Sequence, residues 1–91
     1  MAIEVRIPTI LRTYTDGESE VSAEGDTLAA VLDDLDTHYS GIKGRVLDEG
    51  GELRRFVNVY VGNDDVRFLQ NLETPTPDGT QVSVIPAVAG G

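Results

Sequence analysis

One segment of this chain has helical periodicity, while the other apolar segments alternate as strands do. Its apolar residues recur at i, i+3, i+4, i+7 and i+11: Leu28, Val31, Leu32, Leu35 and Tyr39. Asp26 or Thr27 can cap the start by accepting a backbone N–H, and Ser40-Gly41 fits the end, where glycine is common. A single amphipathic helix buries its stripe only against another layer, so the strands are expected to supply a sheet.

Five strands are expected around this helix, two before it and three after it. They cover residues 3–7, 18–23, 56–61, 66–68 and 81–85. Val46 and Leu47, in the connection 42–53, are expected to tuck under the sheet, and the prolines in residues 69–77 exclude a helix there. The fold class is therefore α+β, with one helix packed across a mixed four- to five-stranded sheet. The first and last strands are the best candidates for adjacent parallel partners at its centre.

The last ten residues change character at Pro86. Val82 and Val84 alternate with polar residues as in a strand, but Pro86 has no N–H to extend a central ladder. Five small residues follow and are predicted to form an extended tail of roughly 17 Å: Ala87, Val88, Ala89, Gly90 and Gly91. Glycines let a partner approach the backbone closely, so the Gly91 carboxylate is predicted to enter another protein's cleft. A frayed end is the competing interpretation.

Length and charge limit the organisation and the partners. With 91 residues, the chain is expected to form one domain over residues 1–91, with residues 87–91 as its tail. Sixteen acidic and seven basic residues give a net charge of −9, which disfavours nucleic acid and anionic membranes as partners. The charge suits a basic docking surface on another protein; solubility alone is the other explanation.

Several residue types and segments are missing from the sequence. There is no cysteine, which excludes disulfides and thiolate metal sites. No apolar run approaches the ~18 residues of a membrane helix, and residues 1–6 lack the basic region and apolar stretch of a signal peptide. A cytoplasmic location is therefore expected.

Five short motifs along the chain match a known family. They are Ile7-Pro8-Thr9-Ile10-Leu11-Arg12, Gly25-Asp26-Thr27-Leu28, Arg55-Phe56-Val57-Asn58-Val59-Tyr60-Val61, Asp65-Val66-Arg67-Phe68 and Ile85-Pro86-Ala87-Val88-Ala89-Gly90-Gly91. In these motifs the chain resembles the ubiquitin-like sulfur-carrier proteins of the ThiS/MoaD group. The first and third are most similar to the branch that serves cysteine biosynthesis. The resemblance implies the ubiquitin-like β-grasp fold.

The resemblance also implies a carrier cycle centred on Gly91. An E1-like adenylating enzyme with a sulfurtransferase would activate this carboxylate and convert it to a thiocarboxylate. A pyridoxal-phosphate-dependent cysteine synthase would use it on O-phosphoserine, leaving cysteine amide-linked to Gly91, and a zinc metallopeptidase would release the cysteine. ATP, pyridoxal phosphate and zinc belong to these partners. The chain itself is therefore expected to need no cofactor and not to be an enzyme.

Two further groups of side chains have more than one interpretation. Phe56 and Tyr60 lie opposite the valine face of their predicted strand, and are candidates for an exposed docking face unless residues 42–53 cover them. His38, one helical turn after Asp34, could be drawn as a metal pair. A solvated helix surface is the better interpretation, and no metal site is expected.

Three other functions stay open. The small subunit of molybdopterin synthase, or a thiamine-pathway sulfur carrier, would use the same activated end. A ubiquitin-like protein modifier would instead join Gly91 to lysines of its targets. A plain binding module with a disordered end would use neither reaction.

Overall fold

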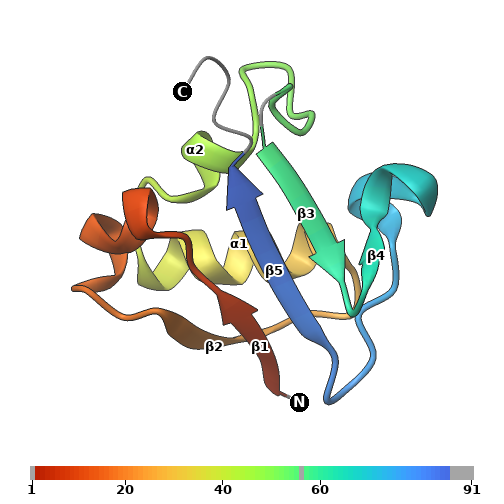
Figure 1. Ribbon diagram of the computed structural model, residues 1–91, viewed down its shortest axis with the longest axis horizontal. Helices are drawn as coiled ribbons and strands as arrows, with labels where there is room; N and C mark the ends of the chain where they lie inside the picture. Colours follow the sequence, from red (N-terminus) through yellow and green to blue (C-terminus); the bar gives the residue numbers. More distant parts are fainter. Residues whose placement is uncertain (1, 56, 87–91) are drawn as a thin grey trace.

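Residues 2–55 and 57–86 are described by a computed structural model of the chain (Figure 1). The elements, with η for a 3-10 helix, are β1 (Ala2–Arg6), η1 (Thr9–Thr15), β2 (Glu20–Glu24), α1 (Leu28–His38), α2 (Lys43–Val46), β3 (Val57–Val61), β4 (Asp64–Asp65), η2 (Val66–Phe68), η3 (Asn71–Glu73) and β5 (Gln81–Pro86). The strands form one sheet in the order β2-β1-β5-β3-β4. Helix α1 crosses one face of it (Figure 1). The α+β prediction is confirmed.

Strand β5 occupies the centre of the sheet. It pairs in parallel with β1, where Val5 lies opposite Val82, and antiparallel with β3, where Val59 lies opposite Val84. Figure 1 shows the red first strand running beside the blue last strand. Both strands alternate apolar and polar residues, so a parallel register places their valines on the same face. The predicted parallel pairing at the centre is confirmed.

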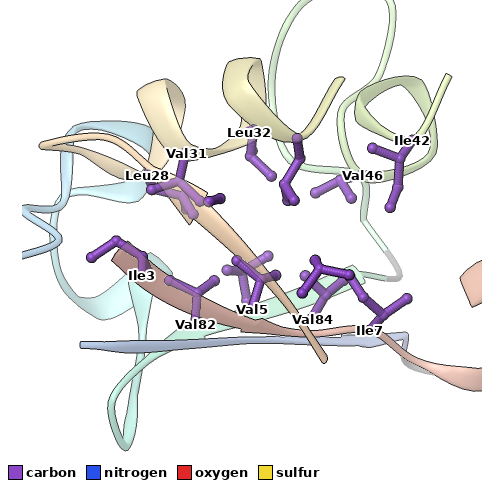
Figure 2. Close-up of a cluster of buried hydrophobic side chains, with 14 of the residues drawn as sticks. Ile3, Val5, Ile7, Leu28, Val31, Leu32, Ile42, Val46, Val82 and Val84 are labelled. Carbon is purple, nitrogen blue, oxygen red and sulfur yellow. The ribbon is translucent and has the colours of Figure 1, made fainter. Parts of the chain in front are cut away.

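The core lies between α1 and the sheet. The predicted stripe of α1 faces the strands: Leu28, Val31, Leu32 and Leu35 are buried, and Tyr39 packs half-buried at the edge. In Figure 2, Leu28 and Val31 point toward Ile3 and Val82. Of the two candidate capping residues, Thr27 is the one that caps α1, because its Oγ1 accepts the Ala30 N–H at 3.3 Å.

The start of α1 is tied to a segment almost fifty residues later. Leu28 N donates to the Thr74 carbonyl at 3.0 Å, and the buried Thr76 Oγ1 donates to the Gly25 carbonyl at 2.8 Å. Gly25 packs so closely on the helix that a Cβ there would lie 2.6 Å from the Val31 nitrogen. These two hydrogen bonds and the close contact at Gly25 position the start of α1.

The strand predicted over residues 66–68 is wrong. The strand pairing with β3 is the two-residue β4, and residues Val66–Phe68 form η2. The Asp65 Oδ1 accepts the Arg67 N–H at 2.9 Å and starts the turn. Val66 is fully buried while Phe68 is 87% exposed, so the three residues do not present one strand face.

Three short helical segments lie where the sequence predicted connections. One of them, η3, is a single 3-10 turn over Asn71–Glu73, inside residues 69–77, so the prediction that the prolines exclude any helix there is wrong for the residues before Pro75. Residues Thr9–Thr15 form η1 after Pro8, and residues Lys43–Val46 form α2. The Asp36 Oδ1 accepts N–H groups from Gly41 and Lys43, which joins the end of α1 to the start of α2. Val46 and Leu47 are buried as predicted.

Among the described residues, no helix has both the length and the apolar character that a membrane span requires.

Candidate functional site

The outward face of the sheet is the one that α1 does not cover. Register places one row of side chains across all five strands of this face: Glu20, Arg6, Ser83, Tyr60 and Asp65. The next row, nearer the end of β5, holds Asn58 opposite Ile85. The Arg6 Nε lies 3.4 Å from the Glu20 Oε2. The face is thus polar along its middle and becomes apolar where β5 ends.

A groove of about 610 Å³ lies at that end of the sheet. Its walls come from the end of β1, from η1, from β2 with the residue before it, and from the end of β5: Arg6, Ile7, Pro8, Thr9, Ile10, Arg12, Ser19, Glu20, Ser83, Val84, Ile85 and Pro86. Two large apolar side chains on it stay accessible, with Ile10 64% and Ile85 48% exposed. An exposed apolar groove rimmed by polar residues is typical of a protein-binding site.

The structure places one of the two predicted docking residues. Tyr60 is half-buried on the outward face, opposite Ser83 and Asp65. The 42–53 connection packs Ile42 and Val46 into the core on the α1 side (Figure 2), away from Tyr60. Phe56 and the predicted tail, Ala87, Val88, Ala89, Gly90 and Gly91, lie outside the described residues.

The His38–Asp34 pair is a surface feature of α1. The His38 Nδ1 lies 2.9 Å from the Asp34 backbone carbonyl and 3.7 Å from its Oδ1, while the Asp34 Oδ2 accepts the Glu24 N–H at 2.9 Å. His38 is exposed. Within residues 2–55 and 57–86, no three His, Cys, Asp or Glu side chains come together as a metal site.

Ile10 and Ile85 were not predicted from the sequence to be exposed on a binding surface. For Ile85 the signal was available, because Val82 and Val84 point inward and alternation then turns Ile85 outward. An outward isoleucine just before the predicted tail indicates a contact surface. Ile10 carried no comparable signal, since its exposure depends on the 3-10 turn that follows Pro8.

Comparisons with known proteins agree with this arrangement. Residues 5–91 match the ThiS family. The chain is 54% identical over 93 residues to the sulfur carrier protein CysO of Mycobacterium tuberculosis, with both chains covered completely. It superposes on the CysO of the Amycolatopsis orientalis BexX/CysO complex with a TM-score of 0.93 and 49% identity, covering 99% of this chain and 100% of that one.

A relative whose name gives a different role also matches. The chain is 40% identical over 65 residues to small archaeal modifier protein 3 of Haloferax volcanii, covering 71% of this chain and 70% of that protein. The ubiquitin-like β-grasp fold that the motifs implied is confirmed by the superposition on CysO. Because the match covers residues 5–91 of its 91 residues, the chain belongs to the ThiS family.

Proposed function

We propose that this chain is a sulfur carrier for cysteine biosynthesis, with the Gly91 carboxylate as the group that carries the sulfur. The observation that carries the proposal is the 54% identity, over the full length of both chains, to a protein named as the sulfur carrier CysO. We further propose that residues 1–91 act as one unit in which residues 87–91 form the extended tail.

The chemistry needs only a carboxylate from this chain. The Gly91 carboxylate attacks the α-phosphate of ATP on an E1-like adenylating enzyme, and pyrophosphate leaves. Sulfide, delivered by a sulfurtransferase, then attacks the acyl-adenylate and displaces AMP, which leaves a thiocarboxylate. A pyridoxal-phosphate-dependent cysteine synthase joins this sulfur to the side-chain carbon of O-phosphoserine as phosphate leaves, and the acyl group then moves from sulfur to the amino nitrogen, which leaves cysteine amide-linked to Gly91. A metallopeptidase releases the amide-linked cysteine and restores the carboxylate.

The outward face and its groove are the surface that the adenylating enzyme would bind. Ile85 precedes Pro86 on the groove wall, so a partner that covers Ile85 and Ile10 also lies beside the start of the tail. Tyr60 extends the contact to β3. Side chains alternate along a strand, so a residue three positions before the inward-facing Val59 would face outward. On this basis Phe56 is proposed to belong to the same docking face.

Intact-mass measurement tests the proposal directly. The chain is incubated with ATP, the E1-like enzyme and sulfurtransferase of the same organism, and a sulfide source. We expect a product in which one sulfur replaces one oxygen. Because the chain has no cysteine, side-chain thiols cannot account for such a product. Addition of the cysteine synthase and O-phosphoserine should convert it to a form extended by one cysteine.

Two controls identify the pathway. Replacing cysteine synthase by the large subunit of molybdopterin synthase with its pterin substrate, or by the thiamine-pathway thiazole synthase, tests the other carrier roles. Sulfur release to either of these, with none to O-phosphoserine, would reassign the chain within the carriers. A chain that never becomes a thiocarboxylate would contradict the carrier role altogether.

The modifier role is the second candidate, because of the 40% identity to small archaeal modifier protein 3. In that role a lysine amine takes the Gly91 acyl group, and heavier conjugates accumulate. Blotting of cell extracts for ladders of this chain, next to the thiocarboxylate measurement, separates the two. Ladders without a thiocarboxylate would favour the modifier.

A further inference from the structure

Five arginines of this acidic chain make no ion pair with any described carboxylate. The described ion pairs join Arg6 to Glu20, His38 to Asp34 and Lys43 to Asp33. The unpaired arginines are Arg12, Arg45, Arg54, Arg55 and Arg67. All of them except Arg55 donate to neutral oxygens of the described residues.

Two of the five, Arg45 and Arg54, lie in one groove of about 350 Å³, which we call the arginine groove. It is lined by Ile10, Leu11, Thr13, Tyr14, Arg45 and Arg54, so none of its lining residues is acidic. The Arg45 Nε donates to the Tyr14 hydroxyl at 2.6 Å, and its Cζ lies 5.8 Å from the centre of that ring. The Arg54 Nε and Nη2 donate to the Gly44 carbonyl at 3.1 and 2.8 Å.

These contacts hold each guanidinium by one edge and leave other N–H groups without a described partner. Arginine carries five N–H donors. Both terminal nitrogens of Arg45, and the Nη1 of Arg54, are without an acceptor among the described residues. The adjacent Tyr14 hydroxyl raises the pKa of Arg45 above its ordinary value, so the guanidinium stays charged. A positioned guanidinium with free donors is suited to bind carboxylates.

The arginine groove adjoins the base of the tail. Ile10 lines both this groove and the larger groove that ends at Pro86. Arg54 is linked to the same place through β3, because the Val57 N–H donates to the Arg54 carbonyl at 3.0 Å and Val57 lies opposite Pro86. In Figure 1, η1, α2 and the start of β3 gather at the end of the sheet toward which β5 points.

We propose that the arginine groove binds an acidic segment of the protein that receives the tail, and so anchors that protein beside the tail. The proposal rests on the proposed function, because it assumes such a partner. Charge complementarity selects this occupant: two unpaired guanidiniums face outward from a groove with no carboxylate, while the net charge of −9 disfavours nucleic acid or an anionic membrane. The lining of this groove is positively charged, whereas the whole chain carries a net negative charge.

Two variants on the same short helix provide a matched test. Arg45→Gln and Lys43→Gln each remove one positive charge from α2, so they change the long-range field equally. Lys43 is paired with Asp33 and does not line the arginine groove. Binding to the E1-like adenylating enzyme is measured by calorimetry at about 50 and about 300 mM salt, two conditions that differ strongly in screening.

We expect Arg45→Gln and Arg54→Gln each to weaken binding about tenfold at the lower salt concentration and to reduce its salt dependence. Lys43→Gln should change the affinity by less than about twofold, because Lys43 lies outside the arginine groove and its exposed ion pair contributes little to stability. Equal effects of Arg45→Gln and Lys43→Gln would overturn the proposal, as would wild-type chain that does not bind. Self-association of the chain that Arg45→Gln abolishes would assign the groove to a second copy instead.

The same samples separate this proposal from the carrier role. At saturating enzyme the arginine variants should still form the thiocarboxylate, because Gly91 is unchanged. If the arginine variants lose affinity as expected but no form of the chain becomes a thiocarboxylate, the carrier role is contradicted and the groove remains a binding site. Thiocarboxylate formation with unchanged affinity in Arg45→Gln would do the reverse. Melting curves of all three variants check that the fold is intact.

Discussion

Val57 of β3 lies directly opposite Pro86 of β5. Proline has no N–H to donate, so the hydrogen-bond ladder of the central strand weakens at the residue before the predicted tail. The Val57 N–H donates back to the Arg54 carbonyl at 3.0 Å. The start of β3 and the end of β5 therefore share one level of the sheet, and this pair is the base from which residues 87–91 are predicted to extend.

Deletion of Gly91 is expected to abolish adenylation without affecting the fold. None of the core residues of the described structure is removed, so the melting temperature should stay within about 1 °C of the wild type. The shortened chain ends in a displaced carboxylate, and ATP–pyrophosphate exchange with the E1-like enzyme measures its activation. Exchange at the wild-type rate would contradict the assignment of Gly91.

Ile85→Thr is expected to weaken binding to the adenylating enzyme by about tenfold. Threonine keeps the β-branched shape that suits a strand but removes apolar contact area from the groove. Phe68→Thr is the matched control, because Phe68 is 87% exposed and lies on η2, outside the groove. Binding is measured by calorimetry. Equal losses for the two variants would show that the groove has no special role.

Gly25→Ala is expected to destabilise the protein by about 1–3 kcal/mol. The added Cβ would lie 2.6 Å from the Val31 nitrogen and 2.7 Å from the Ala30 carbonyl carbon, and neither backbone atom can move without disturbing α1. Gly44→Ala is the control, since a Cβ there meets no described atom within 4 Å, and alanine favours the helix. Urea unfolding should move the two midpoints in opposite directions.

Thr76→Val is expected to cost about 1–3 kcal/mol, because it leaves the Gly25 carbonyl without its 2.8 Å hydrogen bond. Thr76 is 2% exposed, so water does not readily replace the hydroxyl. Thr76→Ser keeps the donor and should recover most of the stability. If Thr76→Val and Thr76→Ser give the same unfolding midpoint, the hydrogen bond from the hydroxyl to Gly25 does not stabilise the protein.

The regular parts of the fold were predictable because each is a segment long enough for its hydrophobic periodicity to be recognised. The stripe from Leu28 to Tyr39 covers three turns and gives the helix, and the alternation of β1 and β5 gives their shared face and parallel pairing. Short elements lack that support. Val66 to Phe68 contains two apolar residues that suit a strand, yet the Asp65 side chain caps a 3-10 turn there.

The candidate site was predictable only where it depends on alternation. Tyr60 on the outward face follows from the valines beside it, and Ile85 could have been found in the same way. The grooves could not, because they combine segments distant in sequence: Tyr14 meets Arg45, and Pro8 and Pro86 line the same groove. Such meetings depend on the turn after Pro8 and on the short helix α2, neither of which has a clear sequence period.

The central place of β5 also has a consequence for synthesis of the protein on the ribosome. β1 emerges early, but its parallel partner emerges after every other strand of the described sheet, so the sheet lacks its middle until β5 has been synthesised. Chains with such distant pairings fold late and slowly. A truncated translation product that ends before β5 has neither a complete sheet nor Gly91. Folding and possession of the proposed reactive carboxylate are thus coupled, and under the carrier proposal incomplete chains would not compete for the activating enzyme.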